Sequence, residues 1–374
     1  MIMRSGRPRR VLMTADTVGG VWTYALDLAR ALGENGVDVV LATLGGRASE
    51  AQRREARGIG TVELLESEYR LPWMEHPWAD VRRAADWLLE LAGQTNPDIV
   101  HVNEPVFGSL AWPAPALAVA HSCVVSWWHS VWGTAPPENW VRYRREMGRG
   151  LRAAQRVVAP SRWMLDAVRR FYGVSGGLVI PNGRCSADLE PQDKEPLVFA
   201  AGRLWDSAKN LLALEPVGQT LPWPIYIAGE PRHPSGEQVT ARHVRLLGQL
   251  PPEAVAAWLR RASIYAFPAR YEPFGLSVLE AALAGCAMVV GDLPTLRELW
   301  DGAAIFVSPD RPEELRLALE GLVDDSALRQ ALAMRARRRA LQYTPARMGR
   351  AYLEVYADLL SSSGRYAEEP ACAS

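Results

Sequence analysis

The chain has 374 residues, of which 48% are hydrophobic and 22% are charged, and its 42 Lys and Arg residues balance 42 Asp and Glu residues. This length exceeds one ordinary hydrophobic core, so the composition predicts a globular protein of two domains. Zero formal net charge argues against a general nucleic-acid-binding protein, which normally has a basic excess.

The first half of the chain alternates short strand-like runs with amphipathic helices. The alternation of strands with helices predicts a parallel sheet with helical crossovers. Strands are predicted at 11–15, 37–42, 98–102, 123–128 and 156–159, and helices at 21–32 and 80–92.

The pattern restarts after Pro181-Asn182-Gly183 and a polar stretch, 183–196, that is predicted to be a linker. Two helices are expected near the C-terminus, at 326–341 and 345–360, and the last ten or so residues are predicted to be disordered. Further strands are predicted at 197–201, 225–228, 244–247, 264–267, 287–290 and 304–307.

The fold class expected from this order is α/β, with two Rossmann-like, doubly wound parallel-sheet domains facing each other across a cleft. The predicted domains are residues 1–181 and 182–344. Ligands of such sheets bind beyond the carboxyl ends of the strands, where loops lead into helices.

Cysteine spacing and hydropathy indicate a cytoplasmic setting. The four cysteines lack paired spacing, so neither a zinc site nor a disulfide framework is predicted. The apolar run 11–15 is too short for a signal peptide. The longest apolar stretch, 110–128, is interrupted by prolines and a histidine, so no transmembrane segment is predicted. Clustered arginines leave peripheral contact with anionic lipid as an alternative to a solvated helix face.

The most informative segment contains two carboxylates eight residues apart. A predicted strand, 264–267, leads into the loop of Glu272 and then into a helix that begins near Leu276. Unpaired backbone N–H groups at a helix start favour an anionic ligand, and Gly275 lets the backbone approach it closely. Glu280, one turn into the helix, is placed to bind the hydroxyls of a ribose, as acidic residues do in nucleotide sites.

A second junction carries two cations. A strand ends at Gly202, Arg203 follows it, and Lys209 precedes a predicted helix. An arginine fork and a lysine point charge are suited to neutralising a diphosphate. Near the N-terminus, Gly19 and Gly20 follow the first strand and predict a tight turn.

These segments together resemble the retaining glycosyltransferases of the GT-B fold, family 4. Glu272 and Glu280 match the spacing of that family's Glu-x7-Glu signature, and the turn Phe274-Gly275-Leu276 matches as well. The family has Gly-Arg-Leu followed by Lys-Gly where this chain has Gly202-Arg203-Leu204 and Lys209-Asn210. The resemblance extends from about residue 11 to about residue 360, and it is most specific at 272–285.

The resemblance implies a role for each matched residue. Glu280 binds the nucleotide ribose, Glu272 contacts the transferred sugar, and Arg203 and Lys209 stabilise the leaving diphosphate. Backbone amides of the Phe274-Gly275-Leu276 turn contact sugar and diphosphate, and Gly19 and Gly20 approach the donor phosphates. The catalytic residues are therefore predicted to be Glu272, His129, Lys209 and Arg203.

The resemblance also implies further features of the fold and the chemistry. His129 resembles the histidine that contacts the reacting sugar, whereas Asn103 replaces the second histidine of a His-x-His pattern. A helix at about 345–362 is expected to pack back on the N-terminal, acceptor-binding domain, with the donor bound by the C-terminal one. The family generally needs no divalent metal, and no Asp-x-Asp motif here contradicts this.

Tryptophans are concentrated before Arg169, where ten of the 14 occur. Most are expected in cores, because aromatic side chains dominate buried area. Trp73, Trp78 and Trp132 fall in loop-like segments, and loops often carry binding groups. We predict that these three line the acceptor site.

The function predicted from the sequence is transfer of a hexose from UDP-sugar or GDP-sugar to an acceptor hydroxyl with retained configuration, without a further cofactor. The acceptor is left open among a sugar, a lipid and a small molecule. The alternatives are a nucleotide-sugar epimerase, a phosphorolytic or hydrolytic enzyme, and a non-catalytic sugar-nucleotide-binding protein. A nucleotide oxidoreductase is excluded by the lack of Gly-x-Gly-x-x-Gly after the first strand.

Overall fold

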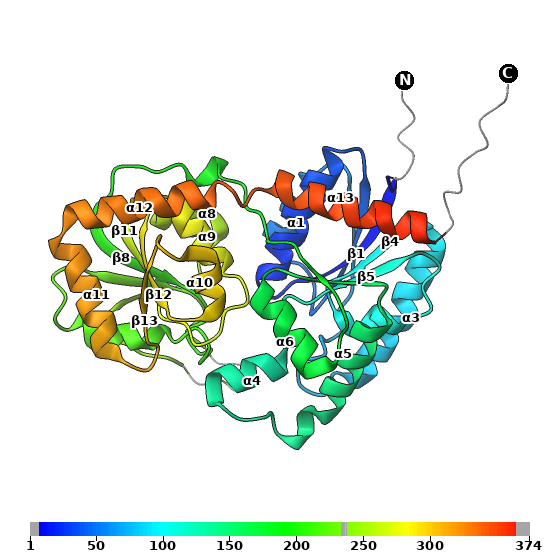
Figure 1. Cartoon of the computed structure of the whole chain (residues 1–374), viewed down its shortest axis with the longest axis horizontal. Coiled ribbons are helices and arrows are strands. Elements are labelled where there is room, and N and C mark those ends of the chain that lie inside the picture. The colour runs from blue at the N-terminus through cyan, green and yellow to red at the C-terminus, as the bar shows by residue number, and fades with distance from the viewer. Residues whose placement is uncertain (1–6, 233–235, 237, 364–374) are drawn as a thin grey trace. The chain divides into compact units, whose positions relative to one another are not determined.

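A computed structural model describes residues 7–232, 236 and 238–363, so the predicted disordered tail lies outside the described residues. The chain divides into two compact units, each coloured by residue number in Figure 1. Unit 1 comprises Met1–Ser126, Ala135–Gly183 and Pro345–Ser374, and unit 2 comprises Trp127–Thr134 and Arg184–Thr344.

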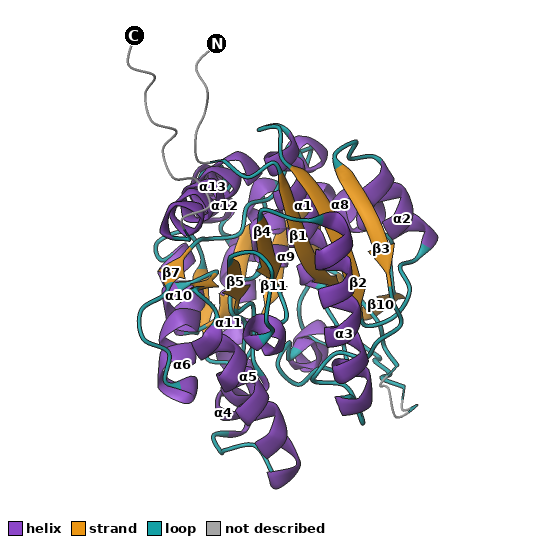
Figure 2. Cartoon of the chain, turned by 90° about the vertical axis from the view of Figure 1, so that its right-hand side faces the viewer, coloured by secondary structure: helices purple, strands orange, loops and turns teal. Residues whose placement is uncertain are grey.

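Unit 1 contains a seven-stranded sheet in which all pairings are parallel, in the order β3-β2-β1-β4-β5-β6-β7. Its strands are β1 (Arg10–Asp16), β2 (Asp38–Leu44), β3 (Val62–Glu66), β4 (Ile99–Val102), β5 (Ala116–Val119), β6 (Arg156–Ala159) and β7 (Leu178–Val179). Figure 2 shows β1, β2 and β3 side by side.

Helices cover both faces of this sheet because its central strands are apolar on both sides. One core cluster packs Leu12, Val40 and Val100 against α3 and its neighbours, and the other packs Val11 and Met13 against α1 and α13. The helices are α1 (Gly20–Gly33), α2 (Glu50–Arg57), α3 (Trp78–Thr95), α5 (Val141–Ala153), α6 (Arg162–Tyr172) and α13 (Pro345–Ser362), with 3₁₀ turns η1 (Pro105–Ser109) and η2 (Glu138–Trp140). Helix α4 (Val124–Trp132) begins in unit 1, and its residues from Trp127 onward belong to unit 2. Thus the last helix of the chain packs beside α1 of unit 1, as Figure 1 shows.

Unit 2 contains a six-stranded parallel sheet in the order β10-β9-β8-β11-β12-β13. Its strands are β8 (Glu195–Ala201), β9 (Ile225–Ala228), β10 (Arg245–Gly248), β11 (Ala262–Phe267), β12 (Ala287–Gly291) and β13 (Ile305–Val307). The helices are α7 (Glu215–Gly218), α8 (Pro252–Arg261), α9 (Leu276–Leu283), α10 (Pro294–Trp300), α11 (Pro312–Asp324) and α12 (Ser326–Ala340), with 3₁₀ turns η3 (Ala187–Leu189) and η4 (Leu211–Leu214).

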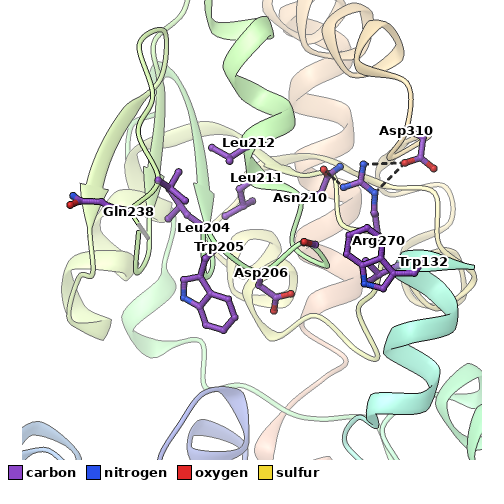
Figure 3. A pocket seen from close by; sticks show the side chains of 13 residues that line it. Trp132, Leu204, Trp205, Asp206, Asn210, Leu211, Leu212, Gln238, Arg270 and Asp310 are labelled. Atoms are coloured by element: carbon purple, nitrogen blue, oxygen red, sulfur yellow. Dashed lines mark hydrogen bonds and ion pairs between the residues drawn. The ribbon is translucent and has the colours of Figure 1, made fainter. Parts of the chain in front are cut away.

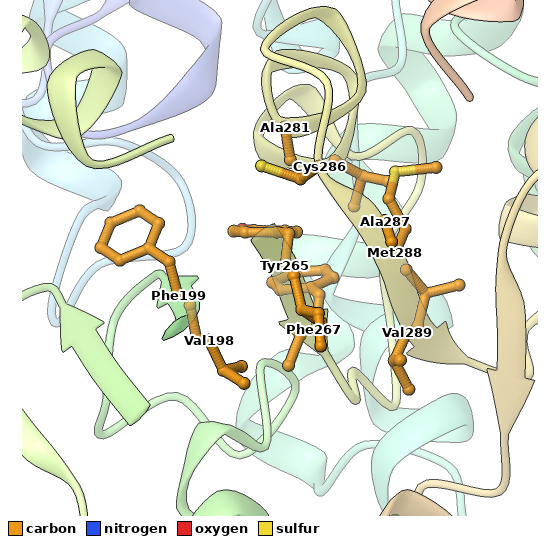
Figure 4. Close-up of a cluster of buried hydrophobic side chains, with 14 of the residues drawn as sticks. Val198, Phe199, Tyr265, Phe267, Ala281, Cys286, Ala287, Met288 and Val289 are labelled. Carbon is orange, nitrogen blue, oxygen red and sulfur yellow. The ribbon is translucent and has the colours of Figure 1, made fainter. Parts of the chain in front are cut away.

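The core of unit 2 lies around its central strands. Phe199 of β8, Tyr265 and Phe267 of β11, and Met288 of β12 are almost completely buried, as Figure 4 shows. The prediction of two doubly wound parallel-sheet units is therefore confirmed.

Three local predictions were wrong. Residues 124–128 of the predicted strand 123–128 form part of helix α4, and the strand between β4 and β6 is instead β5. A short apolar run does not distinguish a buried strand from a helix. In the structure, Ala116–Val119 forms the strand that pairs with both β4 and β6. The edge strands β3 and β7 were missed, and only a 3₁₀ turn, η4, follows Lys209 before the four-residue α7.

Candidate functional site

The order of strands in unit 2 reverses between β8 and β11, and the loops that follow these two strands lie together. The backbone N–H groups of Arg270 and Tyr271 both donate to the carbonyl of Ala208, at 2.8 and 3.4 Å. Such a reversal point is where ligands of open α/β sheets bind. The two most specific sequence segments, 202–210 and 268–275, are therefore neighbours at the ligand-binding edge.

Glycines allow the strand ends at this edge to approach closely. Gly202 has φ +156° and Gly229 has φ +149°, and a Cβ added at Gly229 would lie 1.7 Å from the carbonyl oxygen of Gly202. The N–H of Gly202 donates to Ala228, and the N–H of Gly229 donates to Gly248, at 2.9 and 2.8 Å. These bonds fix the backbone from which Arg203 and its loop project.

Lys209 and Glu272 form an ion pair across the two loops. The Nζ of Lys209 lies 2.7 Å from Oε2 of Glu272, and both side chains are largely buried, at 21% and 12% exposure. The ammonium group also lies 5.5 Å from the ring centre of Phe267. The predicted cation and the predicted sugar-binding carboxylate thus meet at one place.

Asp206 organises the loop that carries both predicted cations. Its buried carboxylate accepts a hydrogen bond from the N–H of Ala208 at 3.0 Å and pairs with the guanidinium of Arg203 at 2.8 Å. The N–H of Lys209 donates to the carbonyl of Asp206 at 2.9 Å. Asp206 therefore sets the positions of Arg203 and Lys209 from one point in the turn.

Asn210 shows why the residue after the lysine can differ from the family's glycine. Its backbone is left-handed, with φ 53° and ψ 28°, a conformation that favours Gly and tolerates Asn. The side-chain amide donates to the carbonyls of Pro268 and Pro309, each at 2.9 Å, and its oxygen accepts from Arg270. Asparagine at this position therefore ties three loops together while it keeps the turn.

Helix α9 begins directly after Gly275, as predicted. Gly275 is left-handed, with φ 91° and ψ 65°, and a Cβ there would lie 3.2 to 3.4 Å from Val278 and Glu272. Side chains rarely adopt this conformation, so a glycine is needed to turn the chain into the helix. The free N–H groups and positive dipole end of α9 are thereby presented beside Glu272.

Glu280 pairs with a residue of the predicted linker. Its Oε1 accepts a hydrogen bond from Nε of Arg184 at 2.7 Å, and the two side chains are 19% and 25% exposed. The N–H of Arg184 in turn donates to the carbonyl of Tyr343 at 3.0 Å. Arg184 therefore holds the carboxylate of Glu280 in one orientation.

A pocket of about 630 Å³ opens beside the Arg203 loop and is shown in Figure 3. The side chains of Trp132, Trp205 and Asp206 line it, together with the ion pair of Arg270 and Asp310. It combines aromatic surface with polar groups, a lining typical of small-molecule sites.

The other predicted residues lie on different elements. Gly19, with φ 123°, precedes α1 of unit 1, and Gly20 is the first residue of that helix. His129 is half-buried in α4 and not at a strand end, because the predicted strand at 123–128 is a helix.

The three predicted acceptor tryptophans have different surroundings. Trp73 and Trp78 are partly buried against the core of unit 1, and Trp78 is the first residue of α3, with the guanidinium of Arg142 4.5 Å from its ring centre. Trp132 is 56% exposed and lines the pocket of Figure 3.

Sequence reasoning missed Arg184 and Asp206. Arg184 falls in the segment interpreted as a linker, and its partner is 96 residues away, so no local pattern could identify it. Asp206 could have been found, because an aspartate three residues before a loop lysine is typical of a side chain that accepts bonds from its own turn.

Two searches of the described residues gave negative results. No group of three or more His, Cys, Asp or Glu side chains in 7–232, 236 and 238–363 is arranged to hold a metal ion. Within the same residues, no helix combines the length and the apolar character needed to cross a membrane.

Family models match most of the chain. Residues 18–184 match Glycosyltransferase Family 4, and residues 195–325 match Glycosyl transferases group 1. The chain is 27% identical over 374 aligned positions to phosphatidyl-myo-inositol mannosyltransferase from Mycolicibacterium smegmatis, covering 93% of this chain and 92% of that protein.

Solved structures share the fold at low sequence identity. Sucrose-phosphate synthase from Thermosynechococcus elongatus superposes with a TM-score of 0.78 at 15% identity, covering 95% of this chain and 100% of that one. Anabaena HepE in complex with UDP-glucose gives a TM-score of 0.72 at 16% identity, covering 94% and 99%. The fold is GT-B, as the sequence predicted.

Proposed function

Because the chain belongs to the family 4, group 1 glycosyltransferases, we propose that it transfers a hexose from a nucleoside-diphosphate sugar to an acceptor hydroxyl with retention of configuration. The observation that supports this most directly is the contact between Lys209 and Glu272 at the reversal point of the second sheet. A cation and a carboxylate side by side, next to a helix start, fit a diphosphate joined to a sugar.

The leaving group is the diphosphate, and unit 2 offers it three sources of positive charge. Lys209, Arg203 and the start of α9 would face the charge that grows as the sugar–phosphate bond breaks. Groups positioned before the reaction stabilise such charge without reorganisation, which makes this kind of stabilisation the largest catalytic contribution in many enzymes. Part of the Lys209 charge is balanced by Glu272, so a bound diphosphate would share the ammonium with that carboxylate.

The two glutamates would hold the two ends of the donor. Glu280, oriented by Arg184, would accept hydrogen bonds from the ribose hydroxyls, and Glu272 would accept them from the transferred sugar. Backbone N–H groups from Phe274 to Leu276 would bind the diphosphate between them.

Retention would follow from attack on the same face that the diphosphate leaves. An oxocarbenium-like sugar forms, a phosphate oxygen of the leaving group takes the acceptor proton, and the acceptor oxygen bonds to the anomeric carbon. A double displacement needs a free carboxylate under that carbon. Glu272 is engaged with Lys209 at 2.7 Å, which disfavours it as the nucleophile. His129 would contact the reacting sugar.

UDP-sugars and GDP-sugars are both proposed donors. The HepE neighbour is described in complex with UDP-glucose, and the mycobacterial relative is named a mannosyltransferase. No further cofactor is proposed. We also propose a cytoplasmic location, since Cys123, Cys185 and Cys286 are free thiols of the kind that a reducing compartment maintains.

The experiment is a panel of UDP-sugars and GDP-sugars tested for thermal stabilisation, hydrolysis and transfer. One nucleotide-sugar should raise the unfolding temperature in proportion to occupancy and be hydrolysed slowly without acceptor. NMR coupling constants of the product should show the anomeric configuration of the donor. Stabilisation without turnover would indicate a binding protein, and release of epimerised donor would indicate an epimerase; either result would contradict the proposal.

A further inference from the structure

Unit 1 has its own reversal point, and two carboxyl groups occupy it. The strand order reverses between β1 and β4, which pair in parallel with Met13 opposite His101. Extending that register by three residues places Asp16, the last residue of β1, opposite Glu104. Glu104 has extended backbone, with φ −110° and ψ 94°, so it continues the line of β4.

The register is held beyond the last strand pair by a side chain. The N–H of Asn103 donates to the hydroxyl of Thr14 at 2.8 Å, and the amide of Asn103 donates to the carbonyl of Thr14 at 2.6 Å. These bonds join the two strands one residue before Glu104 and two residues before Asp16. Asp16 and Glu104 therefore occupy defined positions on neighbouring strands.

The two carboxyl groups are buried close enough to influence each other. Asp16 is 6% exposed and Glu104 is 7% exposed. Burial, and secondly the charge of Asp16, raises the pKa of Glu104 well above its usual value. Two carboxyl groups in such a place share a proton more readily than they both ionise.

Glu104 lacks the partners that a buried carboxyl group normally has. Among the residues that the structure describes, no hydrogen bond or ion pair engages its side chain, whereas Asp16 accepts a bond from the N–H of Val18 at 3.1 Å. The carboxyl oxygens of Glu104 are not completely enclosed by protein atoms, so a ligand can still reach them. A buried polar group without a partner costs free energy, which a bound ligand would recover.

The loops that follow β1 and β2 are uncrowded at two glycines. Gly19 follows β1 and Gly46 follows β2, and a Cβ at either position would have no atom within 4 Å. The hydroxyl of Thr17 donates to the carbonyl of Gly46 at 3.2 Å, which joins the two loops. The two loops that follow neighbouring strands at this edge are thus joined to each other and leave free space at Gly19 and Gly46.

We propose that Asp16 and Glu104 bind hydroxyl groups of the acceptor, and that the acceptor is an uncharged, hydroxyl-rich molecule such as a sugar or cyclic polyol. This proposal rests on the proposed function and deepens it by naming the acceptor class. A carboxyl pair that holds one proton can both accept from and donate to hydroxyls. A phosphate at the same place would meet a negative charge in a poorly solvated environment, where repulsion is strong.

The test compares neutral acceptors with their phosphate esters. Glucose, mannose and myo-inositol are each assayed against the matching monophosphate, at saturating nucleotide-sugar. The ratio of kcat/KM should favour a neutral acceptor by about tenfold or more, because the negative charge of the pair repels the phosphate group of an ester. Preference for an ester, or use of neither set, overturns the proposal.

Two isosteric variants assign the effect to this pair. Glu104→Gln and Asp16→Asn should raise the acceptor KM by about tenfold, far more than they raise the donor KM, and should reduce the preference against esters. Glu63→Gln, at an exposed position of β3, is the matched control. Thermal unfolding verifies that each variant is folded. Equal effects of Glu104→Gln and Glu63→Gln on the acceptor KM would contradict the assignment.

The remaining outcomes separate this proposal from the proposed function. A protein that neither binds nor hydrolyses any nucleotide-sugar contradicts the proposed function itself. A protein that uses a donor but prefers esters contradicts only the acceptor class. Stabilisation by Mg²⁺ or Ca²⁺ alone that Glu104→Gln abolishes would assign the pair to a metal and overturn the proposal.

Discussion

The two units place different chemistry at the same point of the same topology. Where the strand order reverses, unit 2 has the Lys209–Glu272 ion pair and unit 1 has the carboxyl pair of Asp16 and Glu104. Both edges are framed by glycines with positive φ. The comparison teaches that the fold supplies a binding edge twice, whereas the residues after two strands decide which ligand each edge accepts.

The two edges also differ in how deeply their ionisable side chains are buried. The pairs Lys209–Glu272 and Arg184–Glu280 are balanced in charge and keep 12% to 25% exposure. Unit 1 instead buries Glu104 and, three residues earlier, His101, whose burial lowers its pKa to about 3. The balanced pairs of unit 2 thus agree with the proposed charged donor, and the buried groups of unit 1 agree with the proposed neutral acceptor.

The largest expected effect is at the cation of unit 2. Lys209→Met keeps the bulk of the side chain but removes its charge, so turnover should fall by a factor of about 100 to 1,000, as for other groups that stabilise transition-state charge. Steady-state transfer rates measure this loss. Arg311→Ala, which removes an exposed cation of the same unit, should change the rate little, and a near-normal rate for Lys209→Met would refute the leaving-group role.

The next largest expected effect is on the pH dependence of the free energy of unfolding, through His101 of unit 1. Because the folded pKa of His101 is lowered to about 3 from 6.5, the unfolded chain binds this proton more readily. The stability associated with neutral His101 is complete above pH 6.5 and is lost as the pH falls toward 3. Between pH 7 and pH 5 the contribution of His101 to this loss should be about 2 kcal/mol. Burial also lowers the pKa of His121 to about 3, so His121 adds to the total loss of the wild type.

Urea unfolding of the wild type and of His101→Gln at both pH values measures that loss. The variant should show a pH dependence smaller by this amount, even if it is less stable overall because it loses the bond to Tyr356 at 2.7 Å. Identical pH profiles for His101→Gln and the wild type would show that His101 does not cause it.

The smallest expected effect is at the residue that orients Glu280. Arg184→Met removes the 2.7 Å bond to Glu280, so the carboxylate that we propose binds the ribose becomes free to rotate. Nucleotide affinity should fall by about tenfold, the loss typical of one charge-assisted hydrogen bond. Calorimetric titration with UDP and GDP measures it, and Arg184→Lys should restore part of the affinity. Unchanged affinity in Arg184→Met would separate Glu280 from the ribose.

Local patterns predicted the elements that have strong hydrophobic periodicity or a turn residue such as glycine at their boundary. The strand 156–159 and the strand 225–228 were predicted with their observed bounds, and the start of α9 after Gly275 was also correct. Residues 123–128 were misassigned because an apolar run of that length fits either state. Edge strands β3 and β7 were missed because a strand at the edge of a sheet needs little apolar surface, and only pairing with a neighbour reveals it.

The sequence by itself determined which residue types follow each strand, and so the spacing of Glu272 and Glu280, the glycine turns and the cations of the Arg203 loop. Only the tertiary structure decided which of these groups meet: Lys209 with Glu272 across 63 residues, Arg184 with Glu280 across 96, and Asp16 with Glu104. The reason is physical. Propensity and turn chemistry act within a few residues, whereas the pairing of distant strands brings their carboxyl ends together and sets which charges must share one poorly solvated edge.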